Sequence, residues 1–191
     1  MGAPETGLTP DMGQLRVSAM LKGDLVELRA KTDDDEDVLY RIAADLGTWE
    51  ERTPASPAPL SRAAYRARVA SGALDGDADF VITVGGRAVG RVSLFREDPL
   101  ARHAEVGIAL LPDERGRGYG TDALRLAVDF AFVRRNLRRV YLWVLASNEA
   151  AIASYRKVGF VEEGRHREHY WVRGRYEDEV AMGLLRSEWR Y

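Results

Sequence analysis

The segment RGRGYG, residues 115–120, carries the residue types best suited to binding an anion. Its three glycines lack Cβ atoms, so backbone N–H groups can approach a phosphate closely, and a helix that begins there directs the positive end of its dipole at the same point. Neither a dinucleotide fingerprint nor a P-loop fits the spacing. The segment is therefore either a phosphate cradle of another kind or a tight turn beside the solvated Arg115 and Arg117.

Two further side chains offer acid–base chemistry. Glu105 lies inside the strand-like run HAEVGIALL, residues 103–111, where it is either a general base or the partner of an arginine in an ion pair. Tyr155 lies seven residues after Asn148, about two helical turns into the next helix. Its ring is either a proton donor to a leaving group or a part of the hydrophobic core.

Metal binding is not expected from this sequence. His166 and His169 are three residues apart on a predicted strand, so we expect them on opposite faces, where they cannot bind one ion. The acidic run at 75–79 starts like a calcium-binding loop, but Phe80 and Gly86 stand where that loop needs glycine and glutamate.

Charge and composition exclude several classes of protein. The 191 residues carry a net charge of −2 and include no cysteine, which excludes disulfides and thiolate chemistry. The basic run at 134–139 and the acidic run at 33–37 suit helix ends, so no nucleic-acid role is expected. No apolar stretch is long enough for a membrane span, and the N-terminus lacks a signal-peptide pattern. We therefore expect a cytoplasmic protein that does not bind membranes.

Hydrophobic periodicity and capping residues predict the elements that position these groups. Residues 1–20 are expected to form a flexible tail, and residues 21–191 a single domain. The expected strands are 23–30, the hairpin 80–95 with its turn at 85–86, 103–111, 138–146 and the final hairpin 160–185 with its turn at 173–174. The expected helices are 33–46, capped by Thr32, 61–72, 121–132, and 149–158, capped by Asn148. These elements predict an α+β fold in which helices cover both faces of a mixed, mostly antiparallel sheet.

Taken together, these motifs resemble the GNAT superfamily of acetyl-coenzyme A-dependent N-acetyltransferases, over residues 23–186. The loop pattern R/Q-x-x-G-x-G/A matches Arg115, Gly118 and Gly120. The family stretch N-x-x-A-x-x-x-Y-x-K-x-G-F matches NEAAIASYRKVGF, residues 148–160, at every fixed position. The ending GRYEDEVAMGLL, residues 174–185, looks like the branch of ribosomal-protein N-acetyltransferases and spermidine acetyltransferases.

The resemblance implies a central sheet with splayed strands, acetyl-CoA as co-substrate and a homodimer that uses the C-terminal hairpin. Tyr155 takes the position of the family's acid, and Glu105 is the candidate base, acting through a water. A backbone N–H near Val106 or Gly107 is the expected donor to the oxyanion. The residues implied for the pantetheine arm of the cofactor are Ile108, Ala109, Leu110 and Asn148. Those implied for its pyrophosphate are Arg115, Gly116, Arg117, Gly118, Tyr119, Gly120 and Thr121.

Three functions remain open for the sequence. The first is acetylation of a small amine such as a polyamine, an amino sugar or an amino acid derivative, which the presence of Tyr155 favours. The second is acetylation of a protein N-terminus, such as that of a ribosomal protein. The third is a non-catalytic sensor that binds acyl-CoA. The acceptor is expected to lie between residues 46–60 and the last hairpin.

Overall fold

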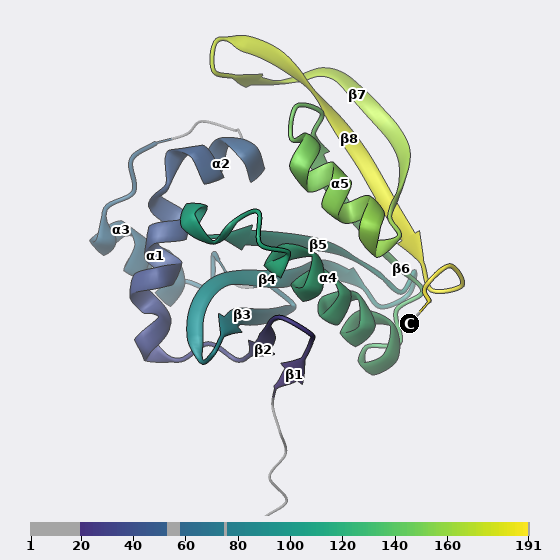
Figure 1. The fold of residues 1–191 in the computed structure, drawn as a ribbon. Helices are drawn as coiled ribbons and strands as arrows, with labels where there is room; N and C mark the ends of the chain where they lie inside the picture. The colour runs from purple at the N-terminus through teal and green to yellow at the C-terminus, as the bar shows by residue number, and fades with distance from the viewer. Residues whose placement is uncertain (1–19, 53–57, 75, 191) are drawn as a thin grey trace, which may run out of the picture.

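The computed structural model describes residues 20–52, 58–74 and 76–190. Its strands form one eight-stranded sheet in the order β1-β2-β3-β4-β5-β6-β8-β7 (Figure 1), in which only β5 and β6 pair in parallel. The strands are β1 (Leu21–Lys22), β2 (Glu27–Arg29), β3 (Ala78–Val84), β4 (Arg87–Asp98), β5 (His103–Leu110), β6 (Arg139–Leu145), β7 (Val161–Val172) and β8 (Arg175–Leu185). The fold is therefore the mixed, mostly antiparallel sheet that the sequence predicts.

The helices follow the predicted order, with two additions, a short helix at 46–52 and a 3-10 turn at 112–114. They are the 3-10 turn η1 (Asp33–Asp35), α1 (Glu36–Ala44), α2 (Leu46–Arg52), α3 (Arg62–Ala70), the 3-10 turn η2 (Pro112–Glu114), α4 (Tyr119–Asp129), which continues as a π-helix over Phe130–Arg134, and α5 (Glu149–Val158). The predicted tail at 1–20 lies outside the described residues except for Met20, and most of the proline-rich loop at 53–59 does so too. The single domain at 21–191 remains a prediction.

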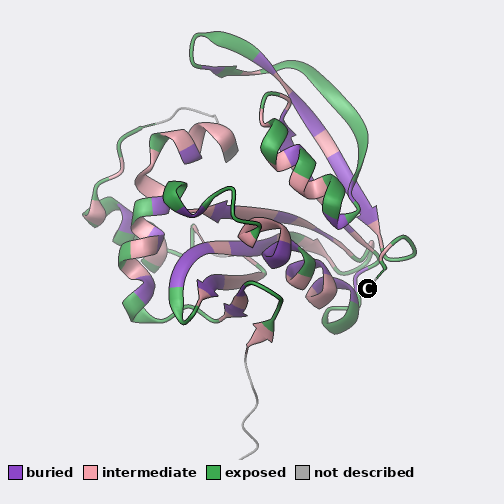
Figure 2. Cartoon of the chain, in the orientation of Figure 1, coloured by how far each residue is buried: buried purple, intermediate pink, exposed green. Residues whose placement is uncertain are grey.

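Helices cover both faces of the sheet, as expected. Successive residues of a strand point to opposite faces, and Val81 and Ile82 of β3 are both buried. Ile82 belongs to the main core with Leu124 of α4, whereas Val81 packs in a second cluster with Leu39 of α1. Figure 2 shows that buried residues alternate with exposed ones along these helices. The core thus lies in two layers, one on each side of the sheet.

Local capping interactions fix the helix starts where the sequence places them. Thr32 and Asp35 form a capping box, and the Ser61 hydroxyl accepts a hydrogen bond from the Ala64 N–H at 3.2 Å. The Asp35 carboxylate is buried and accepts two hydrogen bonds from the Arg29 guanidinium, at 2.6 and 2.8 Å. These bonds, partly offset by burial, lower the pKa of Asp35 to about 2.

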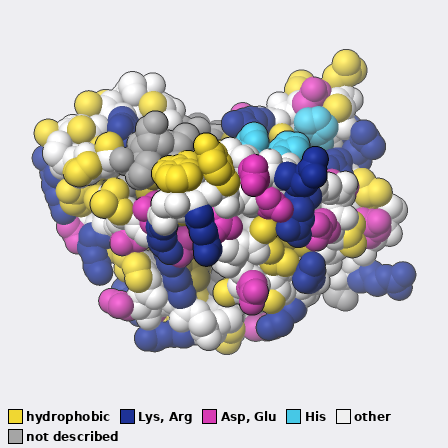
Figure 3. Space-filling model, turned by 90° about the horizontal axis from the view of Figure 1, so that it is seen from above, with side chains coloured by type: hydrophobic (Ala, Val, Ile, Leu, Met, Phe, Trp, Pro, Cys, Tyr) yellow, Lys and Arg dark blue, Asp and Glu magenta, His cyan; other side chains and the backbone are white. Residues whose placement is uncertain are grey.

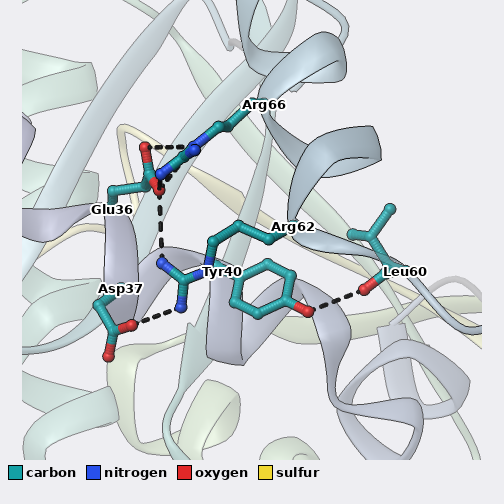
Figure 4. Close-up of polar contacts among 6 residues, drawn as sticks. All are labelled: Glu36, Asp37, Tyr40, Leu60, Arg62 and Arg66. Atoms are coloured by element: carbon teal, nitrogen blue, oxygen red, sulfur yellow. Dashed lines mark hydrogen bonds and ion pairs between the residues drawn. The ribbon is translucent and has the colours of Figure 1, made fainter.

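Polar contacts join α1 to α3, as Figure 4 shows. The Arg62 guanidinium lies 4.4 Å from the centre of the Tyr40 ring and donates to the Asp37 carboxylate. The Arg66 guanidinium donates to both carboxylate oxygens of Glu36, at 3.0 and 3.2 Å from its Nε. Exposed pairs of this kind contribute little to stability because water screens their charges, so they align the two helices rather than hold the fold together.

Two predicted elements differ from the structure. Of the strand expected at 23–30, only β2 forms, because the buried Asp122 carboxylate of α4 accepts the N–H groups of Leu25 (2.7 Å) and Val26 (3.0 Å) where the chain turns between β1 and β2. The helix expected to reach residue 46 ends at Ala44. A second helix, α2, begins at Leu46 because the Asp45 carboxylate accepts the N–H of Thr48 at 2.6 Å.

Candidate active site

The two central strands separate beyond their first three residue pairs. Pairing between β5 and β6 covers only His103–Glu105 with Arg139–Tyr141, although the strands continue to Leu110 and Leu145. On its other edge, β5 pairs with β4 as far as Leu110. The edge of β5 that faces β6 is therefore unpaired over residues 106–110, which confirms the splayed central strands.

The backbone groups of β5 alternate between β4 and this splay. The Leu111 N–H donates to the Val89 carbonyl at 3.0 Å, and the Ala109 carbonyl lies against Gly90 of β4. Because backbone groups of a strand alternate in direction, those of Ile108 and Leu110 point into the splay. An extended ligand can add to this edge as a strand does. Ile108 and Leu110 therefore remain candidate backbone contacts, whereas the Ala109 backbone is directed at β4.

The glycine loop lies at the open end of the splay. Gly116 and Gly118 have φ angles of +75° and +83°, which favour glycine, and Gly118 is the N-cap of α4. A glycine cap has no side chain to occupy the first N–H groups of the helix. A Cβ atom built on Gly120 would lie 3.6 Å from Leu110 Cδ1 and 3.9 Å from Ile108 Cδ1. Hence the helix start and the unpaired edge of β5 form one continuous region.

The two loop arginines are held by carboxylates on either side. Arg115 reaches α2, where its guanidinium donates to the Thr48 hydroxyl at 2.6 Å and to the Glu51 carboxylate at 3.0 Å. Arg117 lies 3.6 Å from the Glu114 carboxylate, which also accepts a hydrogen bond from Arg87 at 2.6 Å. Arg115 therefore couples the glycine loop to α2, a helix that the sequence did not reveal.

Tyr155 is packed into the site from α5. The Thr121 and Ser154 hydroxyls share a hydrogen bond of 2.7 Å between α4 and α5, next to Tyr155 in the chain. The half-buried Tyr155 ring packs against the main core and meets Phe160 edge-on, with 6.1 Å between ring centres. The packing role is thus observed, and the role of its hydroxyl as a proton donor stays a prediction.

Asn148 has the capping role that the sequence predicts. Its side-chain oxygen accepts the Ala151 N–H at 3.1 Å at the start of α5. Contact with the pantetheine arm stays a prediction.

Glu105 sits on the opposite side of the sheet from α4. Its side chain is 17% exposed and accepts a hydrogen bond of 2.8 Å from Arg96, whose side chain is 73% exposed. Tyr141 of β6 is the cross-strand partner of Glu105 in the parallel pair. Burial raises the pKa of Tyr141 most, and the charge of Glu105 raises it further. The ion pair that was one alternative is present. An arginine favours the ionised form of a carboxyl, which is the form that accepts a proton.

A cavity of about 340 Å³ opens between α2 and the final hairpin. Its charged lining consists of Glu50, Glu51, Arg173, Arg175 and Glu177, and Asn148 lines it from the start of α5. Arg173 donates to Glu50 at 2.7 Å, and Arg175 to Glu177 at 2.6 Å. The structure therefore brings together the two regions expected to bind the acceptor.

The expectation that His166 and His169 face opposite sides of a strand is wrong. The pairing of β7 with β8 shifts between His166 and Tyr170, so residues 167–169 all lie opposite one residue of β8. Both imidazoles consequently contact the Glu179 carboxylate, at 3.2 and 3.6 Å. Sequence spacing alone did not single out Glu179, because only the β7–β8 register brings it to the histidines.

The basic run at 134–139 is largely engaged within the protein. Arg135 donates to Glu97 at 2.7 Å, Arg138 to the Ala101 carbonyl at 2.8 Å, and Arg139 pairs with Glu163. Among the residues that the structure describes, none of the helices is long and apolar enough to cross a membrane.

A splayed edge that ends at a helix start capped by glycine is an arrangement that can accept an extended ligand carrying phosphate. The chain belongs to the acetyltransferase (GNAT) domain family, whose model matches residues 26–161. This confirms the resemblance and the fold class drawn from the motifs.

Curated relatives include N-acetyltransferases for two kinds of acceptor. The chain is 35% identical over 101 residues to spermidine N(1)-acetyltransferase of Vibrio cholerae serotype O1, covering 53% of this chain and 58% of the relative. It is 35% identical over 104 residues to "Putative ribosomal N-acetyltransferase YdaF" of Bacillus subtilis strain 168, covering 54% and 57%. The aligned stretch thus spans less than two thirds of either relative.

The crystal structure of spermidine N-acetyltransferase from Vibrio cholerae in complex with CoA and spermine is similar over more of the chain. It superposes with a TM-score of 0.77 at 27% identity, covering 86% of this chain and 97% of that one.

Proposed function

We propose that this protein is an acyltransferase that moves the acetyl group of acetyl-CoA directly to a primary amine of a small molecule of the polyamine type. The observation that carries the proposal is the continuity of the unpaired β5 edge with the helix start at Gly118. It is supported by family membership and by relatives named for spermidine acetylation.

The chain offers separate groups for the two ends of acetyl-CoA. The N–H groups of residues 115–121 bind the pyrophosphate, aided by the dipole of α4. The backbone groups of Ile108 and Leu110 pair with the pantetheine arm, and Asn148 contacts it from α5. This arrangement directs the acetyl end toward the last paired residues of β5 and β6, where Glu105 lies.

Acid–base chemistry then requires a proton acceptor, a proton donor and an oxyanion donor. Glu105 accepts the proton of the attacking amine through a water, since amines of this kind are protonated near pH 7. The Tyr155 hydroxyl gives a proton to the departing thiolate. Of the two expected oxyanion donors, Val106 is the better placed. Backbone groups alternate in direction along a strand, so the N–H of Gly107 points at β4, as those of Ala109 and Leu111 do, whereas the N–H of Val106 points into the splay.

The acceptor occupies the cavity between α2 and the final hairpin. A polyamine is a polycation, and the cavity presents Glu50, Glu51 and Glu177 to it. Two arginines in the same lining pair with Glu50 and Glu177, so binding of an amine must displace or share these partners. A peptide N-terminus is the second candidate acceptor, and the ribosomal relative supports it. A non-catalytic sensor is the remaining alternative.

We further propose a cytoplasmic homodimer that consists of one domain per chain. β7 is the outer strand of the sheet and is exposed over most of its length, as Figure 2 shows. Trp171 and Tyr176 are 59% and 62% exposed at the tip of the hairpin. An unpaired strand edge with exposed aromatic residues suits contact with a second copy. Acetyl-CoA is supplied inside cells, which favours the cytoplasm.

An acceptor panel tests the proposed activity. The purified protein is incubated with acetyl-CoA and, in separate reactions, spermidine, an amino sugar, an amino acid amide and a peptide with a free N-terminus, and release of the thiol is measured. We expect the highest kcat/KM with spermidine. A preference for the peptide would support the second candidate acceptor, and tight CoA binding without thiol release from any amine would support the sensor.

A further inference from the structure

His166, His169 and Glu179 form a cluster that the proposed acetyl transfer does not use. Glu179 Oε2 lies 3.2 Å from Nδ1 of His166 and 3.6 Å from Nε2 of His169. One nitrogen or oxygen atom from each of the three residues lies within 4.8 Å of the others. Figure 3 shows histidine side chains gathered beside acidic ones on the face seen from above.

An irregular stretch of β7 creates this cluster. Three residues, 167–169, face one residue of β8, and Glu168 at their centre has a φ of +51°. The Glu168 N–H donates to the Asp178 carboxylate at 2.9 Å, which holds the bulge against β8. A regular strand would put His169 on the far face. Backbone strain of this kind is concentrated at functional sites, because it persists only where the surroundings maintain it.

The donor set suits a transition-metal ion. Two imidazoles and one carboxylate are common ligands of zinc, and they leave a fourth position for water. Zinc–ligand bonds of about 2.0–2.2 Å in a tetrahedron hold ligand atoms roughly 3.3–3.6 Å apart. The two contacts between Glu179 and the imidazoles already lie close to this range, and all three ligand atoms lie within 4.8 Å of one another, so rotations of the two exposed imidazoles can bring the ligands to one ion.

The surroundings hold the ligands and leave the site open. The Glu179 side chain is 10% exposed, whereas the imidazoles of His166 and His169 are 52% and 46% exposed. The Trp143 ring stacks on His166 at 5.0 Å, and Tyr170 meets His169 edge-on at 4.6 Å. Burial raises the pKa of the Tyr170 phenol, and so do the charge of Glu179 and the hydrogen bond between the two side chains. Such partners orient metal ligands, and the exposed imidazoles give an ion a path of entry.

We propose that His166, His169 and Glu179 bind a divalent first-row transition-metal ion, with zinc the best fit to the ligands. The ion links the bulge of β7 to the adjacent strand β8. Glu105 pairs with Tyr141 and Tyr141 with Gly183, and Glu179 lies four residues from Gly183 on β8, so this link lies on the same side of the sheet as the candidate base. The site is independent of acetyl-CoA binding, and it revises the expectation that no metal is bound.

The three histidines of the chain allow a direct test. Tag-free protein is dialysed against EDTA and titrated with ZnCl₂, while long-range ¹H–¹⁵N spectra report each imidazole and calorimetry gives the Kd. We expect His166 and His169 to shift together with one equivalent of zinc, and His103 to remain unchanged. No shift at a tenfold excess of zinc, or a shift that includes His103 equally, would overturn the proposal.

Two variants and a control separate ligation from surface adsorption. Glu179→Gln keeps the size of a buried side chain but loses the anionic ligand, and His169→Gln changes an exposed one. Each should weaken zinc binding at least about tenfold, because loss of a partner that only orients a ligand already costs about that much. Glu177→Gln on the same strand is the control and should bind zinc as the unmodified protein does. Equal zinc affinities for the unmodified protein and the three variants would show that the cluster is not a metal site. If Glu179→Gln does not fold, the comparison of His169→Gln with the control tests the proposal alone, because His169 is exposed.

Discussion

Replacement of Gly118 by alanine isolates the contribution of the helix start to CoA binding. An L-residue in the left-handed region costs about 1–2 kcal/mol, and Gly118 has a φ of +83°. The new Cβ atom would lie 3.1 Å from Leu25 Cδ1, which belongs to a side chain that is 50% exposed and free to move. The folding cost should therefore come mainly from the backbone.

Gly86→Ala is the matched control for this strain. Gly86 has a φ of +79° in the turn between β3 and β4, and its Cβ atom would meet no atom within 4 Å. Both variants should lose a similar free energy of unfolding, about 1–2 kcal/mol, in urea titrations. Only Gly118→Ala places a methyl group at the helix start that we propose binds the pyrophosphate.

The expected difference appears in CoA affinity. Loss of one charge-assisted hydrogen bond costs about 1.5–3 kcal/mol, which corresponds to roughly a 10- to 150-fold increase in Kd. Calorimetry with CoA should show this increase for Gly118→Ala and wild-type affinity for Gly86→Ala. If both variants lose the same stability and both keep wild-type affinity, the helix start is not the pyrophosphate site, and the glycines serve the turn alone.

Four further predictions follow from the same geometry. Tyr155→Phe removes only a hydroxyl, so kcat should fall about 100-fold with CoA affinity unchanged; a wild-type rate with chemistry rate-limiting would assign Tyr155 to packing alone. Glu105→Gln should remove the acidic limb of the kcat/KM pH profile, whereas loss of stability with that limb intact would identify Glu105 as the ion-pair partner of Arg96. The pKa of Asp35, about 2 in the folded protein, lies below the ordinary value of 3.8 that it has in the unfolded chain, so its stabilisation is complete above about pH 4 and is lost as the pH falls through 2. Asp35→Asn should therefore cost about 2 kcal/mol in urea unfolding at pH 7, and the difference from wild type should vanish near pH 2; a constant difference would disprove the linkage. Light scattering at tens of micromolar should give the mass of a dimer, and a monomer mass would exclude β7 as a stable interface at that concentration.

The sequence alone determined the elements whose ends depend on neighbouring residues. Ser61 and Asn148 cap helices because their side-chain oxygens reach N–H groups three residues further on, and Gly159 ends α5 because it adopts a φ of +113°. The glycine pair between β3 and β4 specified its hairpin in the same way. These interactions span a few residues, so their outcome is written into the local pattern.

The motifs also determined the family, because each motif combines several residues at fixed spacing. They could not show how far β5 and β6 remain paired, nor that the backbone groups of Ile108 and Leu110, and not those of Ala109, point into the splay. Nor could they show that Arg115 reaches Thr48 on α2. These facts depend on contacts between residues that are distant in the chain.

Only the tertiary structure decided to which face of the sheet the two histidines point. The period of two residues that governs a regular strand puts His166 and His169 on opposite faces. In the structure, β8 pairs on both sides of the bulge and forces residues 167–169 to accommodate the difference in register. The direction of His169 is thus set by hydrogen bonds to another strand, and a one-strand pattern carries no information about them.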